Sequence, residues 1–139
     1  MCKSKRDFIV AVDFDGTIAN NAFPDITKAE LMPDIKLFLS NIKWCIEQKG
    51  FNPIFVLWTC RSNNKLGNFL DAAIQYCKNN EIHFDYINES PRHPMFKNIK
   101  VENPSPKIHA DVYIDDKALN FYEDYRFIDY LEEYIKNEK

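Results

Sequence analysis

The sequence lacks several features that mark particular classes of protein. Its four cysteines form no Cys-x-x-Cys pair and show no zinc-ligand spacing, which argues against a structural zinc site. No stretch approaches the roughly 20 apolar residues that span a bilayer. The first apolar run, residues 8–12, is too short for a signal peptide and ends in Asp13. We therefore expect a cytoplasmic protein that has no membrane partner.

The chain also has no excess of positive charge. The formal net charge is −3 and the longest basic stretch is Lys3-Ser4-Lys5-Arg6, so the chain shows no electrostatic footprint for nucleic acid. A local basic patch can still form in three dimensions, which leaves a nucleic-acid substrate open. The length of 139 residues, with 45% apolar and 28% charged residues, predicts a soluble single domain over residues 1–139.

The cysteines are expected to be structural. Cys45 and Cys77 fall on the apolar faces of predicted helices, so we expect both to be reduced, buried small hydrophobes. Cys60 follows a predicted strand, but the sequence offers it no obvious activating partner. A core or supporting position is therefore favoured for Cys60 over a nucleophilic role.

The apolar residues that are present recur with two kinds of spacing. Short apolar runs predict strands at residues 8–12, 53–59, 83–87 and 112–114. Helical spacing predicts helices at residues 33–50, 66–79 and 127–135. Residues 88–107 hold four prolines and little periodicity, which indicates a long ordered loop. Strands that alternate with helices predict an α/β fold, with a Rossmann-like, doubly wound, mainly parallel sheet flanked by helices.

Polar residues cluster at the ends of the predicted strands. They are Asp13, Asp15, Thr59, Lys107 (just ahead of the last core strand), Asp115 and Asp116. The carboxyl edge of an open parallel sheet is where ligands bind, because helix N-termini and loop amides converge there. Carboxylates grouped at that edge repel one another unless a cation or a shared proton intervenes. Mg²⁺ suits such a site because it takes oxygen ligands and leaves room for water and phosphate, so we expect Mg²⁺ as cofactor.

The order of these motifs resembles that of the haloacid dehalogenase (HAD) superfamily. Asp-x-Asp-Gly-Thr follows the first strand, Thr follows the second, and Lys and then Asp-Asp flank the last core strand. All four family motifs therefore find a match in order and spacing, over residues 9–116. The resemblance implies a magnesium-dependent phosphatase that hydrolyses phosphomonoesters through an aspartyl-phosphate.

The resemblance gives the two carboxylates of the first motif different roles. Asp13 resembles the nucleophile that attacks phosphorus. Asp15 resembles the general acid that protonates the leaving oxygen and then the base that activates water, and its main-chain carbonyl resembles a metal ligand. Metal ligation would hold Asp13 ionised while Asp15 stays able to carry a proton. An aspartate at the second position distinguishes phosphatases and phosphotransferases from the dehalogenase branch.

The remaining motifs supply charge and hydrogen bonds in the same resemblance. Thr59 resembles the residue that hydrogen-bonds the transferring phosphoryl group. Lys107 resembles the lysine whose charge steadies Asp13 and the phosphate oxygens. Asp115 and Asp116 resemble the acidic pair that completes the metal shell, one directly and one through water.

Each of these residues also has an ordinary structural interpretation. Thr59 can be a cap or turn residue at the end of a strand. Lys107 can be a solvated loop lysine, and Lys100 and Lys117 are its rivals for the site. Asp116 can be the N-cap of a following turn.

Three further residues are candidate substrate contacts. Arg61 follows Thr59 by two residues, and its guanidinium matches phosphate oxygens well, although an exposed arginine at a helix start is the competing interpretation. Arg92 and His93 lie in the proline-rich loop that we expect to overhang the site.

The spacing between the motifs leaves little room for a cap domain. From Asp15 to Thr59 the chain has enough residues for the predicted helix and strand and, at 18–32, for the squiggle-and-flap hairpin of the family. Between Thr59 and Lys107, the loop at 88–106 is too short for a folded cap. The resemblance therefore implies a capless or minimally capped member with an open site. Such a site admits small or polymeric phosphorylated substrates, or is shielded by a partner subunit in a homo-oligomer.

Two alternatives use similar residues. A phosphotransferase on the same scaffold would pass the phosphoryl group to an acceptor other than water. A signalling receiver domain also combines a phosphorylated aspartate with an acidic pair, a Thr and a Lys. The receiver places its acidic pair at the first strand, whereas here the pair comes last, so motif order disfavours it.

Overall fold

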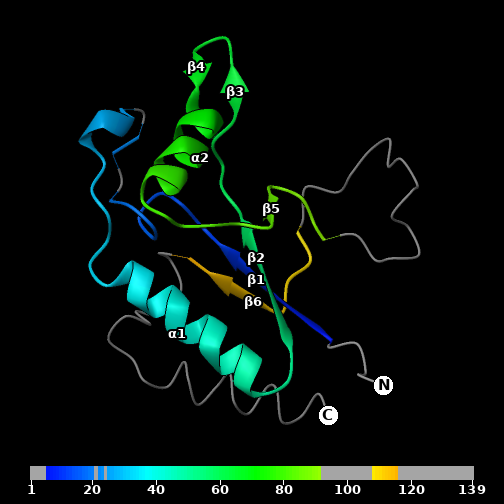
Figure 1. The fold of residues 1–139 in the computed structure, drawn as a ribbon. Coiled ribbons are helices and arrows are strands. Elements are labelled where there is room, and N and C mark those ends of the chain that lie inside the picture. Colours follow the sequence, from blue (N-terminus) through cyan, green and yellow to red (C-terminus); the bar gives the residue numbers. More distant parts are fainter. Residues whose placement is uncertain (1–5, 21, 24, 92–107, 116–139) are drawn as a thin grey trace, which may run out of the picture.

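A four-stranded parallel sheet forms the centre of the protein, with the strand order β5-β2-β1-β6 (Figure 1). This computed structural model describes residues 6–20, 22–23, 25–91 and 108–115. The strands of the sheet are β1 (Asp7–Val12), β2 (Asn52–Leu57), β5 (Tyr86–Ile87) and β6 (Val112–Ile114). The other elements are η1 (Ile26–Lys28), α1 (Ile35–Gln48), α2 (Phe69–Asn79), and a hairpin of β3 (Asn63–Asn64) and β4 (Gly67–Asn68). The mainly parallel sheet with its helices confirms the predicted α/β class.

Strand β1 is buried on both faces, which explains its continuous apolar run. Phe8, Val10 and Val12 point to the larger core cluster, which also contains buried residues of α1 and α2. Ile9 and Ala11 point to a smaller cluster on the opposite face. Both described helices therefore cover the same face of the sheet. The doubly wound arrangement stays a prediction, and the helix predicted at 127–135 lies outside the described residues.

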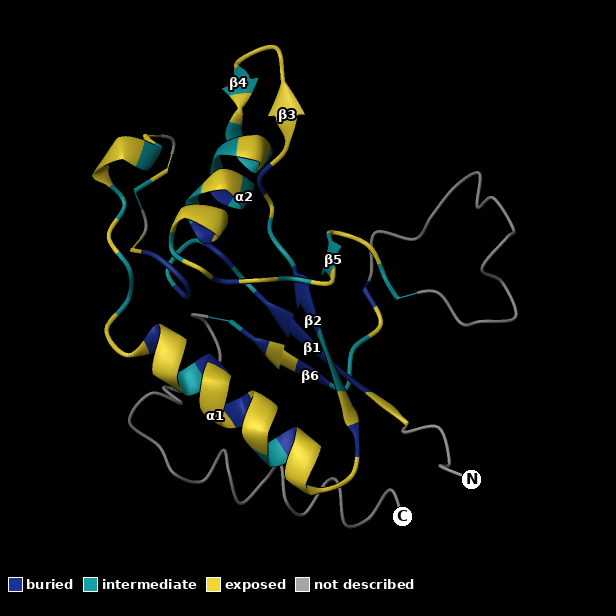
Figure 2. Ribbon diagram, viewed as in Figure 1, coloured by how far each residue is buried: buried dark blue, intermediate teal, exposed yellow. Residues whose placement is uncertain are grey.

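The sequence of helix α1 explains which face of the helix is buried and where the helix ends. Its buried residues Ile35, Leu39, Ile42 and Ile46 recur at helical spacing, and the buried stretches of α1 lie on its side toward the sheet (Figure 2). At its end Gly50 has a φ of +85°, which suits the left-handed position after a helix. The Gly50 and Phe51 amides donate back to the carbonyls of the last turn, at 3.0 and 3.1 Å. The predicted closure of this helix at Gly50 is confirmed.

Several predicted boundaries are wrong. The helix predicted from residue 33 begins at Ile35, and the strand predicted to reach residue 59 ends at Leu57. The helix predicted from residue 66 begins at Phe69, because residues 63–68 form the β3–β4 hairpin, which projects beyond the end of α2 (Figure 1). Leu66, whose apolar side chain suggested the helix, lies at the tip of that hairpin and is 88% exposed. The strand predicted at 83–87 is also shorter, because only the two residues of β5 pair with β2.

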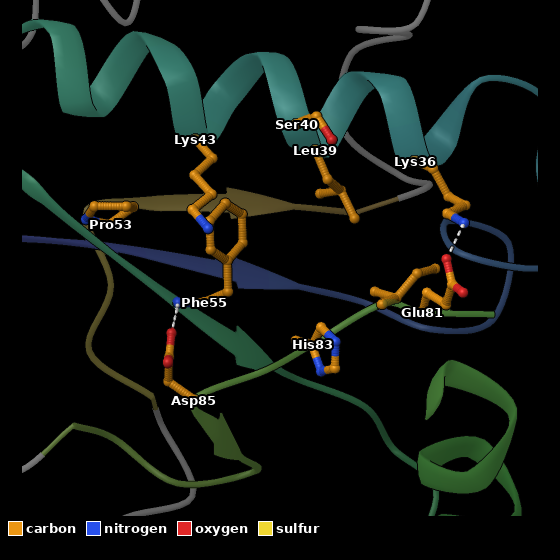
Figure 3. Close-up of a pocket in the computed structure, with 10 residues that line it drawn as sticks. Lys36, Leu39, Ser40, Lys43, Pro53, Phe55, Glu81, His83 and Asp85 are labelled. Atoms are coloured by element: carbon orange, nitrogen blue, oxygen red, sulfur yellow. Dashed lines mark hydrogen bonds and ion pairs between the residues drawn. The ribbon is translucent and has the colours of Figure 1, made fainter. Parts of the chain in front are cut away.

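Aspartates at the entrances of β5 and β6 fix the register of these short strands. The Asp85 carboxylate accepts from the Phe55 amide of β2 at 2.8 Å (Figure 3), and the Asp85 amide donates to the Phe55 carbonyl at 2.8 Å. Asp111 forms the same two-bond pair with Ile9 of β1, again at 2.8 Å for each bond. Each aspartate therefore extends the ladder by one position ahead of a strand of only two or three residues.

The cysteines differ in burial. Cys77 is buried, as predicted, and burial raises the pKa of its thiol to about 12. Cys45 is only half-buried. Cys60 is exposed, so of the core or supporting position favoured for it, the core position is wrong. Cys45, Cys60 and Cys77 form no disulfide bond. None of the described helices has both the length and the apolar character needed to cross a membrane.

Removal of the Asp111 carboxylate is expected to weaken the pairing of β6 with β1. Asp111→Ala leaves the amide of the buried Ile9 without its acceptor, so the free energy of unfolding should fall by about 1–3 kcal/mol. Asp111→Asn keeps an acceptor oxygen and should lose less, while Asp7→Ala at the exposed start of the strand should change the stability by under about 0.5 kcal/mol. Denaturant unfolding measures all three, and equal losses in the two Asp111 variants would contradict this account.

Ionisation of Cys77 is expected to destabilise the fold at high pH. Its folded-state pKa of about 12 lies above the usual value of 9.0, so stability from the protonated thiol is present below pH 9 and is lost as the pH rises toward 12. At pH 10 the unfolded chain should gain about 1 kcal/mol from this single group. The measurement is denaturant unfolding at pH 7 and pH 10. The decrease should be smaller in Cys77→Val than in the wild type, whereas Cys60→Ala should follow the wild type.

Candidate active site

The parallel register brings two carboxylates to adjacent strand ends. Val12 of β1 pairs with Ile114 of β6, so Asp13 and Asp115 come next on neighbouring strands at the same edge of the sheet. The Asp13 amide donates to the Ile114 carbonyl at 2.9 Å, which continues the ladder to this point. Both aspartates are half-buried. The sequence-based prediction that they meet at the carboxyl edge agrees with this register.

A tight turn after β1 presents Asp15 from the same edge. The Phe14 carbonyl accepts from the amides of Thr17, Ile18 and Ala19, at 3.0 to 3.2 Å. Gly16 has a φ of +83°, a conformation that favours glycine, and its amide donates to the Ala19 carbonyl at 2.7 Å. The Phe14 side chain is fully buried and makes an edge contact with the Tyr76 ring, with the centroids 5.7 Å apart. The turn is therefore anchored in the core between its two aspartates.

Thr59 lies at the same edge, two residues after the last residue of β2. The Trp58 amide donates to the Val12 carbonyl at 2.8 Å, so this segment stays beside the end of β1. The Thr59 hydroxyl accepts from the Arg61 amide at 3.1 Å, which is a turn role, and the hydroxyl proton can still be donated to a ligand. Both the functional and the structural interpretations of Thr59 are therefore compatible with its position.

Asn88 belongs to this edge and was missed by sequence reasoning. Its side-chain oxygen accepts from the Thr59 amide at 2.8 Å, and its own amide donates to the Leu57 carbonyl at 2.7 Å. Its φ of +51° is a left-handed conformation that Asn tolerates better than most residues. The available signal was a polar residue directly after the predicted strand at 83–87, as at the other strand ends.

Arg61 forms a bidentate ion pair with Asp15. Its Nε and Nη2 atoms each donate to one oxygen of the Asp15 carboxylate, both at 2.8 Å. The arginine side chain is 2% exposed and that of Asp15 is 22% exposed. Its guanidinium carbon lies 4.9 Å from the centroid of the Phe14 ring and 5.2 Å from that of the Phe23 ring. The interpretation of Arg61 as an exposed helix-start residue is wrong.

Other predicted site residues lie outside the described residues. This applies to Lys107 and its rivals Lys100 and Lys117, and to Asp116, Arg92 and His93. Of the predicted set, the structure describes Asp13, Asp15, Thr59, Arg61 and Asp115.

The carboxylates of the described site limit the kind of metal ion that can bind there. Within the described ranges, no group of three or more His, Cys, Asp or Glu side chains is arranged to hold a metal. Mg²⁺ is commonly held by one or two carboxylates, with water and substrate phosphate as the other ligands. The two carboxylates Asp13 and Asp115, on adjacent strand ends, are compatible with that kind of site.

A described groove lies elsewhere on the molecule. Its volume is about 260 Å³, and it lies between α1 and the segment that leads to β5 (Figure 3). Its wall carries both signs of charge, with Lys36 and Glu81 3.6 Å apart. None of the residues discussed at the sheet edge lines it. The groove therefore adds nothing to the candidate site.

The order of motifs and the geometry of the sheet edge are the only grounds for a functional assignment. Comparison of the chain with models of protein families, with curated proteins and with solved structures found no match.

Proposed function

We propose that the protein is a magnesium-dependent phosphomonoester hydrolase of the HAD type, with Asp13 as its nucleophile. The observation that carries the proposal is the register of β1 and β6, which brings Asp13 and Asp115 to neighbouring strand ends. Asp15 and Thr59 lie at the same edge: Asp15 is on the hydrogen-bonded turn after β1, and the Thr59 amide donates to the Asn88 side chain. Carboxylates with two distinct tasks, a hydroxyl donor and a charge-neutralising cation are the components that phosphoryl transfer needs.

The reaction would proceed in two displacements. A carboxylate oxygen of Asp13 forms a bond to phosphorus while the bond from phosphorus to the leaving oxygen breaks, and Asp15 gives that oxygen a proton. Water then attacks phosphorus, Asp15 takes the proton from this water, and Asp13 and inorganic phosphate are released. The Thr59 hydroxyl would donate to a phosphoryl oxygen in both steps. A bound Mg²⁺ would offset the charge of the carboxylates and the phosphate.

The remaining parts of the proposal concern two residues outside the described ranges, the form of the sheet and the entrance to the site. Lys107 would steady the charge on Asp13, and Asp116 would complete the metal shell with Asp115. The Rossmann-like, doubly wound form of the sheet belongs to the same proposal. Within the described segments, the insertions between β1 and α1 and between β2 and α2 are η1 and the β3–β4 hairpin, and both are short, which supports a capless enzyme. The open entrance of such an enzyme suits phosphorylated small molecules as well as polymers.

Replacement of the nucleophile is expected to abolish turnover. Asp13→Asn cannot form the aspartyl-phosphate, so hydrolysis of a generic aryl phosphate with Mg²⁺ should fall to background, as it should when a chelator removes the metal from the wild type. Asp7→Asn is the matched control, because it changes an exposed aspartate at the far end of the same strand and should leave the rate unchanged. Phosphate release measures the rate. Activity that survives in Asp13→Asn would exclude Asp13 as nucleophile.

Replacement of the proton carrier is expected to slow turnover without removing the metal site. Asp15→Asn keeps the main-chain carbonyl but cannot exchange a proton, so kcat should fall by at least ~10²-fold. Mg²⁺ affinity, measured by titration calorimetry, should change little because the Asp13 and Asp115 side chains are intact. A variant with the wild-type kcat would rule out the acid–base role of Asp15.

A further inference from the structure

The guanidinium of Arg61 contacts other residues of the protein rather than solvent. The residue is 3% exposed. Two of its nitrogens bind the Asp15 carboxylate, and the third, Nη1, lies 3.4 Å from the Phe69 carbonyl. The Phe14 and Phe23 rings lie near the guanidinium and limit its movement further. A direct contact with substrate phosphate would require Arg61 to leave this set of partners.

The fork of Arg61 fixes one edge of the Asp15 carboxylate. A carboxylate has about four lone-pair positions on its two oxygens, and the bidentate contact occupies one on each. The plane of the carboxylate is thereby set, and one lone pair on each oxygen stays available for a proton. Arg61 itself has no proton to exchange, because a guanidinium stays protonated in proteins.

We propose that Arg61 is a positioning residue, which orients Asp15 for proton exchange with the leaving group and with water. This inference rests on the proposed phosphatase function. Orientation matters to such a step, since a misplacement of about 1 Å can slow a reaction about 10²-fold. The backbone supports the arrangement, because the Arg61 amide is held by the Thr59 hydroxyl. The turn after β2 therefore orients the acid–base residue on the turn after β1.

A double-variant comparison separates positioning from the other roles of Arg61. If Arg61 acts only through Asp15, Arg61→Gln should lower kcat by at least about 10-fold, and Asp15→Asn with Arg61→Gln should be within about 3-fold of Asp15→Asn alone. Contact with the phosphoryl group, or a general structural role, would instead multiply the two losses. Multiplied losses would overturn the proposal.

The shape of the guanidinium gives a second test. Arg61→Lys keeps the positive charge but replaces a planar fork with a single point charge, so it should also lose at least about 10-fold in kcat. Phenyl phosphate is the substrate, because phenol has a pKa of about 10 and its departure benefits from a proton. KM should change less than kcat in both Arg61 variants. Wild-type kcat in the lysine variant, or a loss confined to KM, would overturn the proposal.

A measurement without substrate or metal reports on the ion pair itself. The Arg61 Nε proton should exchange slowly with solvent in the nitrogen-15 NMR spectrum of the wild type, and faster in Asp15→Ala. Circular dichroism and thermal unfolding establish that each variant is folded before it is compared. Rapid exchange in the wild type would show that the pair does not persist in solution, and would overturn the inference even in an active phosphatase. A wild type that turns over no phosphate ester overturns the proposed function instead, and the positioning role with it.

Discussion

Parallel pairing of β1 with a strand on each side is the constraint on which the rest of the described structure depends. Val12 is aligned with Leu57 on one neighbour and with Ile114 on the other, so three strands end together. Backbone pairing alone thereby brings chain segments that are far apart in sequence to one edge of the sheet. A slip of one residue would turn every core side chain of β1 to the opposite face, so burial on both faces protects this alignment. The aspartates at the entrances of β5 and β6 secure the same alignment where the strands are too short to do so alone.

Sequence reasoning succeeded where a residue's role depends on its own neighbours in the chain. The run at 8–12, the stop at Gly50 and the short strand at 112–114 were predicted because apolar spacing and glycine chemistry are local signals. The placement of Asp13 and Asp115 after neighbouring strands was predicted from the general behaviour of parallel strand ends rather than from any pairwise signal. The placement of the two aspartates required only the positions of the strands and a parallel sheet.

The misses have in common that backbone pairing or side-chain contacts, which apolar spacing does not record, decided them. Leu66 continues the apolar spacing of α2, yet a two-residue hairpin ladder takes it to an exposed tip. Arg61 was judged from its charge as a surface or substrate residue, although an acidic partner 46 positions away compensates for its burial. Removal of one partner from such a pair typically costs about 3–5 kcal/mol, because the other charge is left in a poorly solvated place. Burial of Arg61 thus depends on Asp15, which no local pattern records.

Phe14, between the two aspartates of the first motif, links the candidate site to the cooperativity of folding. Its ring is fully buried, and its carbonyl holds the turn that presents Asp15. A segment that is anchored in this way cannot open by itself, because its opening would expose core surface shared with β1 and α2. Local opening is therefore expected at exposed segments such as the hairpin tip at Leu66. The turn with Asp13 and Asp15 is expected to open only together with the core. Forms of this protein in which only such segments open would keep the sheet edge, and its chemistry would be lost together with the core.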